Sequence, residues 1–233
     1  MPEALALQGV TAGYGETHVL EGVALSLAQG ETLSIIGRNG VGKSTLLETL
    51  MGHTTLHAGE IRLHGTPINL APAHARAQAG LGYVPQEREI FPSLSTRENL
   101  ELCARPGDWD LERVCALFPN LRPRLSNAGS QLSGGEQQML AIARALMTNP
   151  SVLLMDEPTE GLAPVIVQAL TQVLVKLRSR GKLSIVLVEQ NSRVALEFSE
   201  RTVVMDRGCI VYDGASERLR KAPDFLASLI AAQ

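Results

Sequence analysis

The residues with the clearest chemistry form a glycine-rich segment, Gly37-Arg38-Asn39-Gly40-Val41-Gly42-Lys43-Ser44, which matches G-x-x-x-x-G-K-[ST] at every fixed position. Glycines let a backbone wrap around phosphate groups with its N–H groups inward. A helix that starts here also turns its positive end toward the anion. Lys43 can reach the β- and γ-phosphates, and the Ser44 hydroxyl can ligate Mg²⁺. The segment predicts a site for MgATP, although a plain glycine-rich turn is the alternative. The predicted ATP-binding residues here are Gly37, Arg38, Asn39, Gly40, Val41, Gly42, Lys43, Ser44 and Thr45.

Two carboxylates, Asp156 and Glu157, follow the apolar run Val152-Leu153-Leu154-Met155. An aspartate at the end of a central strand can hold Mg²⁺, directly or through water. The adjacent glutamate can orient or deprotonate an attacking water. An apolar run that ends in Asp-Glu is a weak signal alone, but it gains weight beside a phosphate loop. We therefore predict that Asp156 and Ser44 serve the metal and that Glu157 and Lys43 are catalytic.

A second helix start carries the pattern Leu132-Ser133-Gly134-Gly135-Glu136-Gln137. A serine and two glycines at a helix N-terminus can bind an anion by the same physics as the phosphate loop. Two such helix ends in one chain suggest ATP sandwiched between two copies. Ser133 and Glu136 also fit a simple capping box, so both interpretations stay open. The predicted ATP-binding residues of this segment are Ser133, Gly134, Gly135 and Glu136.

The elements that must position these residues alternate between strand and helix. Short apolar runs at 33–36, 152–155, 184–188 and 202–205 are typical of strands buried on both faces. Helical patterns cover Lys43 to Met51, Gly135 to Met147 and Val165 to Arg180. This alternation predicts an α/β fold with a mostly parallel core sheet, with the chemistry at the carboxyl ends of the strands.

Two regions depart from that alternation. The first 30 residues carry a Gly-Tyr-Gly turn followed by alternating apolar residues from Val19 to Leu27, which indicates an antiparallel hairpin. Residues from about 87 to 130 are irregular and contain short helical pieces. We expect one domain, 1–233, in which 1–86 and 131–233 form the core and about 87–130 form a helical insert. Asp206-Arg207-Gly208 resembles a hairpin turn, and Glu217 to Ala232 is predicted to be an amphipathic tail.

Composition excludes several classes of protein. Only 3% of the residues are aromatic and the net charge is −3, so neither stacking platforms nor a basic surface for nucleic acid are expected. The three cysteines are far apart, and the five histidines are scattered, so disulfides and a zinc site are not expected. The sequence shows neither a signal peptide nor a run of about 18 apolar residues. If the protein works at a membrane, a partner must span it.

The motifs, in this order and spacing, make the chain resemble the ATPase subunit of an ATP-binding cassette (ABC) transporter. The segment 37–44 resembles that family's Walker A motif, 132–137 its signature motif, and 152–157 its Walker B motif with the catalytic glutamate. The resemblance implies a P-loop NTPase domain of the ABC type, with an N-terminal antiparallel β subdomain and an inserted helical subdomain. It also implies that Tyr14 stacks on adenine and that Gln86 senses Mg²⁺ and the transmembrane partner.

A narrower resemblance is to importers of branched-chain and other hydrophobic amino acids. It rests on Gly161-Leu162-Ala163-Pro164, on Gln190-Asn191 and on the segments around Gln86. Importers of urea and short amides are the alternative, because they share the phosphate-loop sequence Arg38-Asn39-Gly40-Val41. Most members of the family have a histidine at the position of Gln190 and an aspartate at that of Ala163. Gln190 can donate a hydrogen bond but cannot carry a proton. We therefore predict that hydrolysis persists but depends less on this position, although Gln190 is kept among the catalytic candidates.

The resemblance also implies partners. Importers of this branch are assemblies of two ATPase subunits, alike or different, and transmembrane permease subunits. An external substrate-binding protein would then be an indirect partner of this chain. The chain would then be peripheral on the cytoplasmic face of the inner (plasma) membrane. Near Gln86, the apolar residues Ile90, Phe91 and Leu94 could form a groove for a permease helix or could simply pack inside the insert.

Other functional classes have weaker support. ABC ATPases that act on DNA or ribosomes usually carry tandem cassettes or a long coiled coil, which this chain lacks. A catalytically dead cassette is disfavoured because Lys43 and Glu157 are both present. Export is disfavoured by the narrower resemblance alone, since a cassette does not encode direction.

Overall fold

The computed structural model describes residues 2–178 and 183–231 and is built around a six-stranded sheet. Its strand order is β10 (Cys209–Ala215), β9 (Arg201–Asp206), β3 (Thr32–Ile36), β8 (Ser184–Glu189), β7 (Val152–Asp156) and β6 (Leu81–Val84). The pairs from β9 to β6 are parallel, and β10 runs antiparallel to β9. The predicted α/β fold with a mostly parallel core sheet is confirmed.

A second, antiparallel sheet is formed by the N-terminal part of the chain. Its order is β2 (Thr17–Ala28), β1 (Glu3–Tyr14), β4 (Thr55–Leu63) and β5 (Thr66–Pro67). Apolar side chains of β1 and β2 share one core cluster with α1 (Lys43–Met51) and with one face of the central sheet. The predicted hairpin is confirmed, but Tyr14 is the last residue of β1 and the turn follows it.

Alternate residues of the central strands bury their side chains in different layers. Val152 and Leu154 of β7 pack toward α1 and the antiparallel sheet, whereas Leu153 and Met155 pack into a second cluster on the other face. That second cluster contains α3 (Thr96–Glu101), α4 (Leu111–Leu117), α5 (Gly134–Met147) and α6 (Pro164–Arg178). Because both faces are covered, the strands are continuously apolar, as parallel strands usually are.

The remaining helices are short. α2 (Ala73–Gln78) precedes β6, α7 (Ser192–Phe198) follows β8, and α8 (Ser216–Lys221) and α9 (Pro223–Ala231) end the described chain. The 3₁₀ segments are η1 (Pro119–Arg124) and η2 (Gly129–Gln131). α7, α8 and α9 form a third small core with Ile36 and Val204. The predicted amphipathic tail is therefore two helices separated by Ala222, and Ala232 lies outside the described residues.

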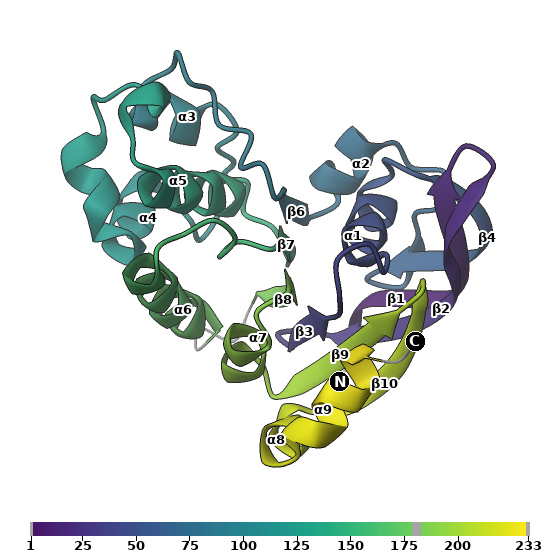
Figure 1. Ribbon diagram of the computed structural model, residues 1–233. Helices are drawn as coiled ribbons and strands as arrows, with labels where there is room; N and C mark the ends of the chain where they lie inside the picture. The colour runs from purple at the N-terminus through teal and green to yellow at the C-terminus, as the bar shows by residue number, and fades with distance from the viewer. Residues whose placement is uncertain (1, 179–182, 232–233) are drawn as a thin grey trace.

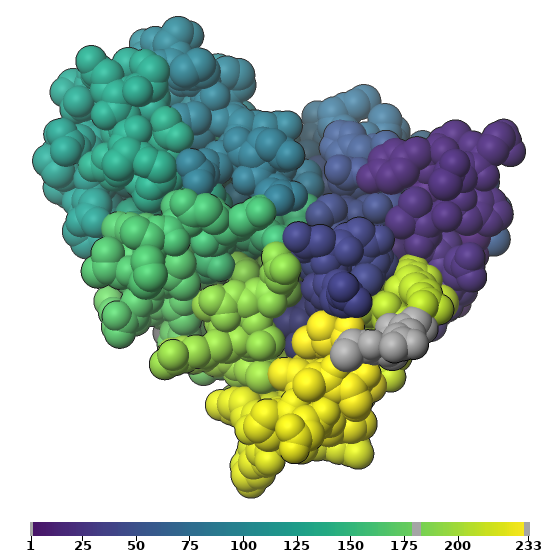
Figure 2. Space-filling view, viewed as in Figure 1, coloured from purple at the N-terminus to yellow at the C-terminus, as the bar shows by residue number. Residues whose placement is uncertain are grey.

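The molecule has two arms above the central sheet (Figure 1). One arm carries α3, α4 and α5, and the other carries α1, α2 and the antiparallel sheet. The space-filling view shows a notch between the teal arm and the purple and blue arm (Figure 2). The chain between β6 and α5 contributes α3, α4 and the two 3₁₀ segments, while the domain boundaries near residues 87 and 130 stay a prediction.

Most predicted elements lie where expected, with small shifts at their ends. α5 begins one residue earlier than predicted, at Gly134, and α6 begins at Pro164. The predicted end of α6, near Gly181, lies outside the described residues. The strands β4 and β6 were not identified from the sequence. Among the described residues, no helix is long and apolar enough to cross a bilayer.

Candidate nucleotide-binding site

The phosphate loop, Gly37–Ser44, connects β3 to α1 at the carboxyl end of the central sheet. Gly42 caps α1 with φ 104°, a left-handed backbone conformation that favours glycine. Because glycine has no side chain, the cap does not occupy the N–H groups of the first turn. The loop borders a pocket of about 320 Å³. The lining residues are Val19, Asn39, Gly40, Gly42, Lys43, Ser44, Thr45, Gln86 and Glu157.

Lys43 is buried and folds back over its own loop. Its Nζ donates to the carbonyls of Gly37 at 3.0 Å and Arg38 at 3.1 Å. It also lies 3.0 Å from Glu157 Oε1, and both side chains are nearly inaccessible, at 4% and 6% exposure. A buried charge needs such a partner, because burial without one is costly. Incoming phosphates would compete with Glu157 for this ammonium.

Asp156 lies at the end of β7 and accepts a hydrogen bond from the Ser44 side chain. Burial raises its pKa to about 6; the Ser44 hydrogen bond opposes this, and the nearby Glu157 charge adds to it. Its Oδ1 is buried with no hydrogen-bond partner among the described residues. A buried unsatisfied carboxylate oxygen beside a serine hydroxyl fits the oxygen-rich coordination that Mg²⁺ requires.

Glu157 has a left-handed backbone, with φ 43°, which is unusual for a non-glycine residue. Its N–H donates to the Val188 carbonyl at 2.9 Å, which ties the turn after β7 to β8. Such outliers often occur at functional sites, where the surrounding structure holds them. The Glu157 side chain borders both the phosphate-loop pocket and a neighbouring pocket between α6 and α7.

Tyr14 and Gln86 reach this region from other strands. Tyr14, half exposed at the end of β1, donates its hydroxyl to Glu48 Oε2 at 2.5 Å and lies 3.4 Å from Thr45 Oγ1. Burial and the Glu48 contact raise the pKa of Tyr14. Gln86 follows β6 and donates its amide to Glu160. Gln86 lines the pocket of the phosphate loop. Tyr14 lies beside α1 and is not among the residues that line this pocket.

Ser133 caps α5 through a full capping box with Glu136. The Glu136 N–H donates to Ser133 Oγ at 3.3 Å, and the Ser133 N–H donates to Glu136 Oε2 at 2.8 Å. Arg124 also contacts Glu136, and these bonds, first of all the Ser133 backbone bond, lower the pKa of Glu136. The predicted capping box is present, and Ser133, Gly134, Gly135 and Glu136 are not among the residues that line the phosphate-loop pocket.

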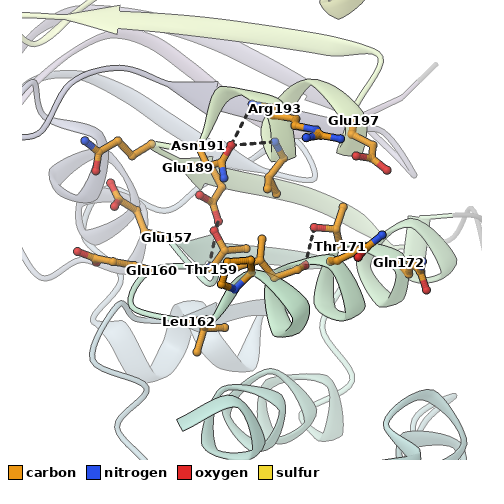
Figure 3. A pocket seen from close by; sticks show the side chains of 15 residues that line it. Glu157, Thr159, Glu160, Leu162, Thr171, Gln172, Glu189, Asn191, Arg193 and Glu197 are labelled. Atoms are coloured by element: carbon orange, nitrogen blue, oxygen red, sulfur yellow. Dashed lines mark hydrogen bonds between the residues drawn. The ribbon is translucent and has the colours of Figure 1, made fainter.

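The neighbouring pocket, about 770 Å³, is lined by one residue that the sequence predicted as a site residue and by another that it did not (Figure 3). The predicted candidate Gln190 lines it, exposed, directly after β8. Glu189, which precedes Gln190, was not singled out; it is 2% exposed. Burial raises its pKa to about 7, against the effect of hydrogen bonds from Thr159 and Asn191. The sequence signal was a lone glutamate ending an apolar run, the same pattern as Asp156.

Comparisons with known proteins identify the family of this chain. The family model described as ABC transporter matches residues 20–160. The chain is 38% identical to a high-affinity branched-chain amino acid transport ATP-binding protein of Pseudomonas aeruginosa, with 94% of this chain and 96% of that protein covered. It is 36% identical to a probable branched-chain amino acid transport ATP-binding protein of Archaeoglobus fulgidus, with 93% and 94% covered.

A solved structure gives the same fold. A dimeric ATP-binding cassette, in a post-hydrolysis state bound to ADP and phosphate, is 28% identical with a TM-score of 0.79, covering 91% of this chain and 98% of that one. The matched segment contains the phosphate loop, the Ser133 helix start, Asp156 and Glu157. The chain therefore belongs to the ABC transporter family, as a nucleotide-binding ATPase domain.

Proposed function

We propose that this chain is the subunit that binds and hydrolyses MgATP in an importer of branched-chain (hydrophobic) amino acids. The observation that carries the proposal is the convergence of Lys43, Ser44 and Glu157 on the pocket of the phosphate loop. Asp156 lies directly beside them, within hydrogen-bonding reach of Ser44. The two relatives reported above bear that transport function in their names. The protein would act at the cytoplasmic face of the inner membrane, bound to permease subunits.

Each residue of the loop has a role in this proposal. The backbone N–H groups of residues 37–45 bind the phosphates, and Lys43 exchanges its contact with Glu157 for the β- and γ-phosphates. Ser44 and Asp156, with Gln86 nearby, would hold Mg²⁺, which neutralises charge developing on the phosphates. Glu157, released from Lys43, orients the attacking water and accepts its proton.

Two further residues are assigned secondary roles. Tyr14 would stack on the adenine, because its ring lies beside α1 at the border of the phosphate loop. Gln190 would donate a hydrogen bond near the γ-phosphate without exchanging a proton. If Gln190→Ala abolished turnover as completely as Glu157→Gln, this assignment would be wrong.

The second helix start is proposed to act across a dimer. Ser133–Glu136 do not line the phosphate-loop pocket of their own chain, so a contact with ATP requires a second cassette, alike or different. The dimeric cassette with ADP and phosphate supports this arrangement. Two ATP molecules would then be sandwiched, each between one phosphate loop and one Ser133 segment.

The permease contact is proposed at Phe91, in the helical insert of about 87–130. Phe91 is 42% exposed, and the Arg144 guanidinium lies 5.2 Å from its ring centroid. Ile90 instead packs against the second core cluster, which favours a structural role for that residue. Phe91→Asp should leave ATP binding intact and prevent assembly with the permease; loss of folding would contradict the contact. An external binding protein would deliver the amino acid to the permease.

The test is ATP turnover by the purified chain, with Glu157→Gln beside the wild type. Light scattering in MgATP would follow dimerisation. We expect the wild type to hydrolyse ATP and Glu157→Gln to stall as an ATP-bound dimer. A Glu157→Gln protein that turned over normally would refute the site. The substrate is tested separately by reconstituting the subunit with its permease and measuring ATP-dependent uptake of leucine against urea.

A further inference from the structure

Glu189 is a buried carboxylate at the junction of the strands that carry the site. It ends β8, where its backbone pairs with Ile36 of β3, directly before the phosphate loop. The preceding residue, Val188, pairs with Asp156 of β7. Glu189 thus lies between the two segments that hold the phosphate loop and Asp156.

The Glu189 side chain binds the turn that follows Glu157. Its Oε1 accepts hydrogen bonds from the Thr159 N–H at 3.1 Å and from Thr159 Oγ1 at 2.8 Å (Figure 3). The side chain is 2% exposed, so these bonds are made without competition from bulk water. Hydrogen bonds in such surroundings are strong and directional.

The turn is therefore anchored at both ends by consecutive residues of β8. The Glu157 N–H donates to the Val188 carbonyl, and Thr159 is held by the Glu189 carboxylate. Between these anchors, Glu157 has its left-handed φ of 43°. An unfavourable backbone conformation persists only where the surroundings hold it.

We propose that Glu189 is a positioning residue: through Thr159 it fixes the turn that aims the Glu157 carboxylate at the attacking water. The inference rests on the proposed catalytic role of Glu157. A misplacement of a reacting group by a fraction of an ångström lowers turnover without weakening nucleotide binding, because the phosphates are bound by other residues.

The test compares kcat, KM for ATP and thermal stability for Thr159→Val, Thr159→Ser and Glu189→Met. Thr159→Val removes the hydroxyl and keeps the shape, whereas Thr159→Ser keeps the hydroxyl. We expect Thr159→Val to lower kcat about tenfold with KM close to wild type, and Thr159→Ser to restore wild-type kcat. The melting temperature of Thr159→Val should fall by only about 2–4 °C, because one buried hydrogen bond is lost. Glu189→Met should lower kcat at least as much. The double variant Thr159→Val with Glu189→Met should lower kcat little further than Glu189→Met alone.

The matched control is Thr171→Val in the same pocket. Thr171 Oγ1 donates to the Val167 carbonyl within α6, so this variant makes the same chemical change without touching Glu189. Its kcat should equal that of the wild type. A Thr159→Val protein with wild-type kcat, or a fall in kcat that only follows loss of folded protein, would overturn the inference.

The Glu157→Gln protein separates this inference from the function on which it rests. If Glu157→Gln stalls while Thr159→Val and Glu189→Met hydrolyse ATP at the wild-type rate, only the positioning role fails. If Glu157→Gln itself hydrolyses ATP normally, the proposed role of Glu157 fails, and the positioning role fails with it.

Discussion

The two anion-binding helix starts of this chain, at α1 and at α5, differ in how their first amide groups are occupied. At α1 the cap is Gly42, which has no side chain to bind the N–H groups. At α5 the cap is Ser133, whose Oγ accepts the Glu136 N–H of the first turn, while the Glu136 carboxylate accepts the Ser133 N–H. Both ends have the positive potential of a helix N-terminus. Only at α1 is the cap without a side chain that occupies an amide of the first turn.

The difference also explains where charge is placed. The α1 end has Lys43 paired with Glu157, so a cation is ready for phosphate. The α5 end has the carboxylate of Glu136, which stabilises the helix but would repel a phosphate unless the anion binds the Ser133 side. We infer that α1 anchors the nucleotide and that α5 completes the site only after a second cassette closes on it.

The largest effect is expected from Lys43→Met, which removes the cation of the α1 end. Turnover should fall by about 100- to 1000-fold, as for other removals of a charge-stabilising donor. The measurement is steady-state phosphate release, with Lys221→Met as the control, since Lys221 forms an exposed ion pair with Glu217 and lines neither of the two pockets described above. A fall below tenfold would show that the loop amides suffice.

The next effect is a pH dependence of stability that comes from Asp156. Its folded pKa of about 6 lies above the ordinary 3.8, so the folded state binds the proton more tightly than the unfolded state. Stability is therefore lost as pH rises from about 4 to about 6 and stays lower above. In Asp156→Asn this loss is absent. Without nucleotide and Mg²⁺, the variant should gain up to about 3 kcal/mol relative to wild type between pH 4 and 7.

Urea denaturation at several pH values measures this change. The raised pKa of Glu189 is present in both proteins, so its effect should cancel in the difference. A difference in the free energy of unfolding that did not vary with pH would mean that Asp156 is not desolvated as described.

A matched pair of glycine substitutions compares the two helix starts directly. Gly42→Ala places a side chain on a left-handed backbone and should cost about 1–2 kcal/mol of stability. Gly134→Ala meets only the flexible end of Arg88, at 3.3 Å, so stability should change by less than about 0.5 kcal/mol. Chemical denaturation measures both. Equal losses would remove the distinction between the two ends.

A smaller loss than that of Gly42→Ala is expected from Ser133→Ala, which removes the cap of α5. The free energy of unfolding should fall by about 1 kcal/mol, the usual value of an N-cap. ATP binding to the isolated subunit, measured by calorimetry, should not change. Weaker binding in the monomer would place Ser133 in the site of its own chain, against the two-copy arrangement.

Local patterns in the sequence were sufficient for much of the fold. The buried strands β3, β7, β8 and β9 are short, continuously apolar runs, and α1 follows directly from the glycine pattern of its loop. Strand β4 was missed because its exposed and half-buried residues lack clear alternation, and β6 was missed because it is only four residues long. Both strands depend on neighbours that are distant in sequence.

The candidate site divides in the same way. The sequence by itself determined the phosphate loop, the paired carboxylates and the second helix start, because each is a contiguous motif whose residue types carry the chemistry. Only the tertiary structure decided that Lys43 pairs with Glu157, that Tyr14 donates a hydrogen bond to Glu48, and that Glu189 accepts one from Thr159. Each of these contacts joins residues at least 30 positions apart. Their geometry comes from strand order and packing, which no local pattern encodes.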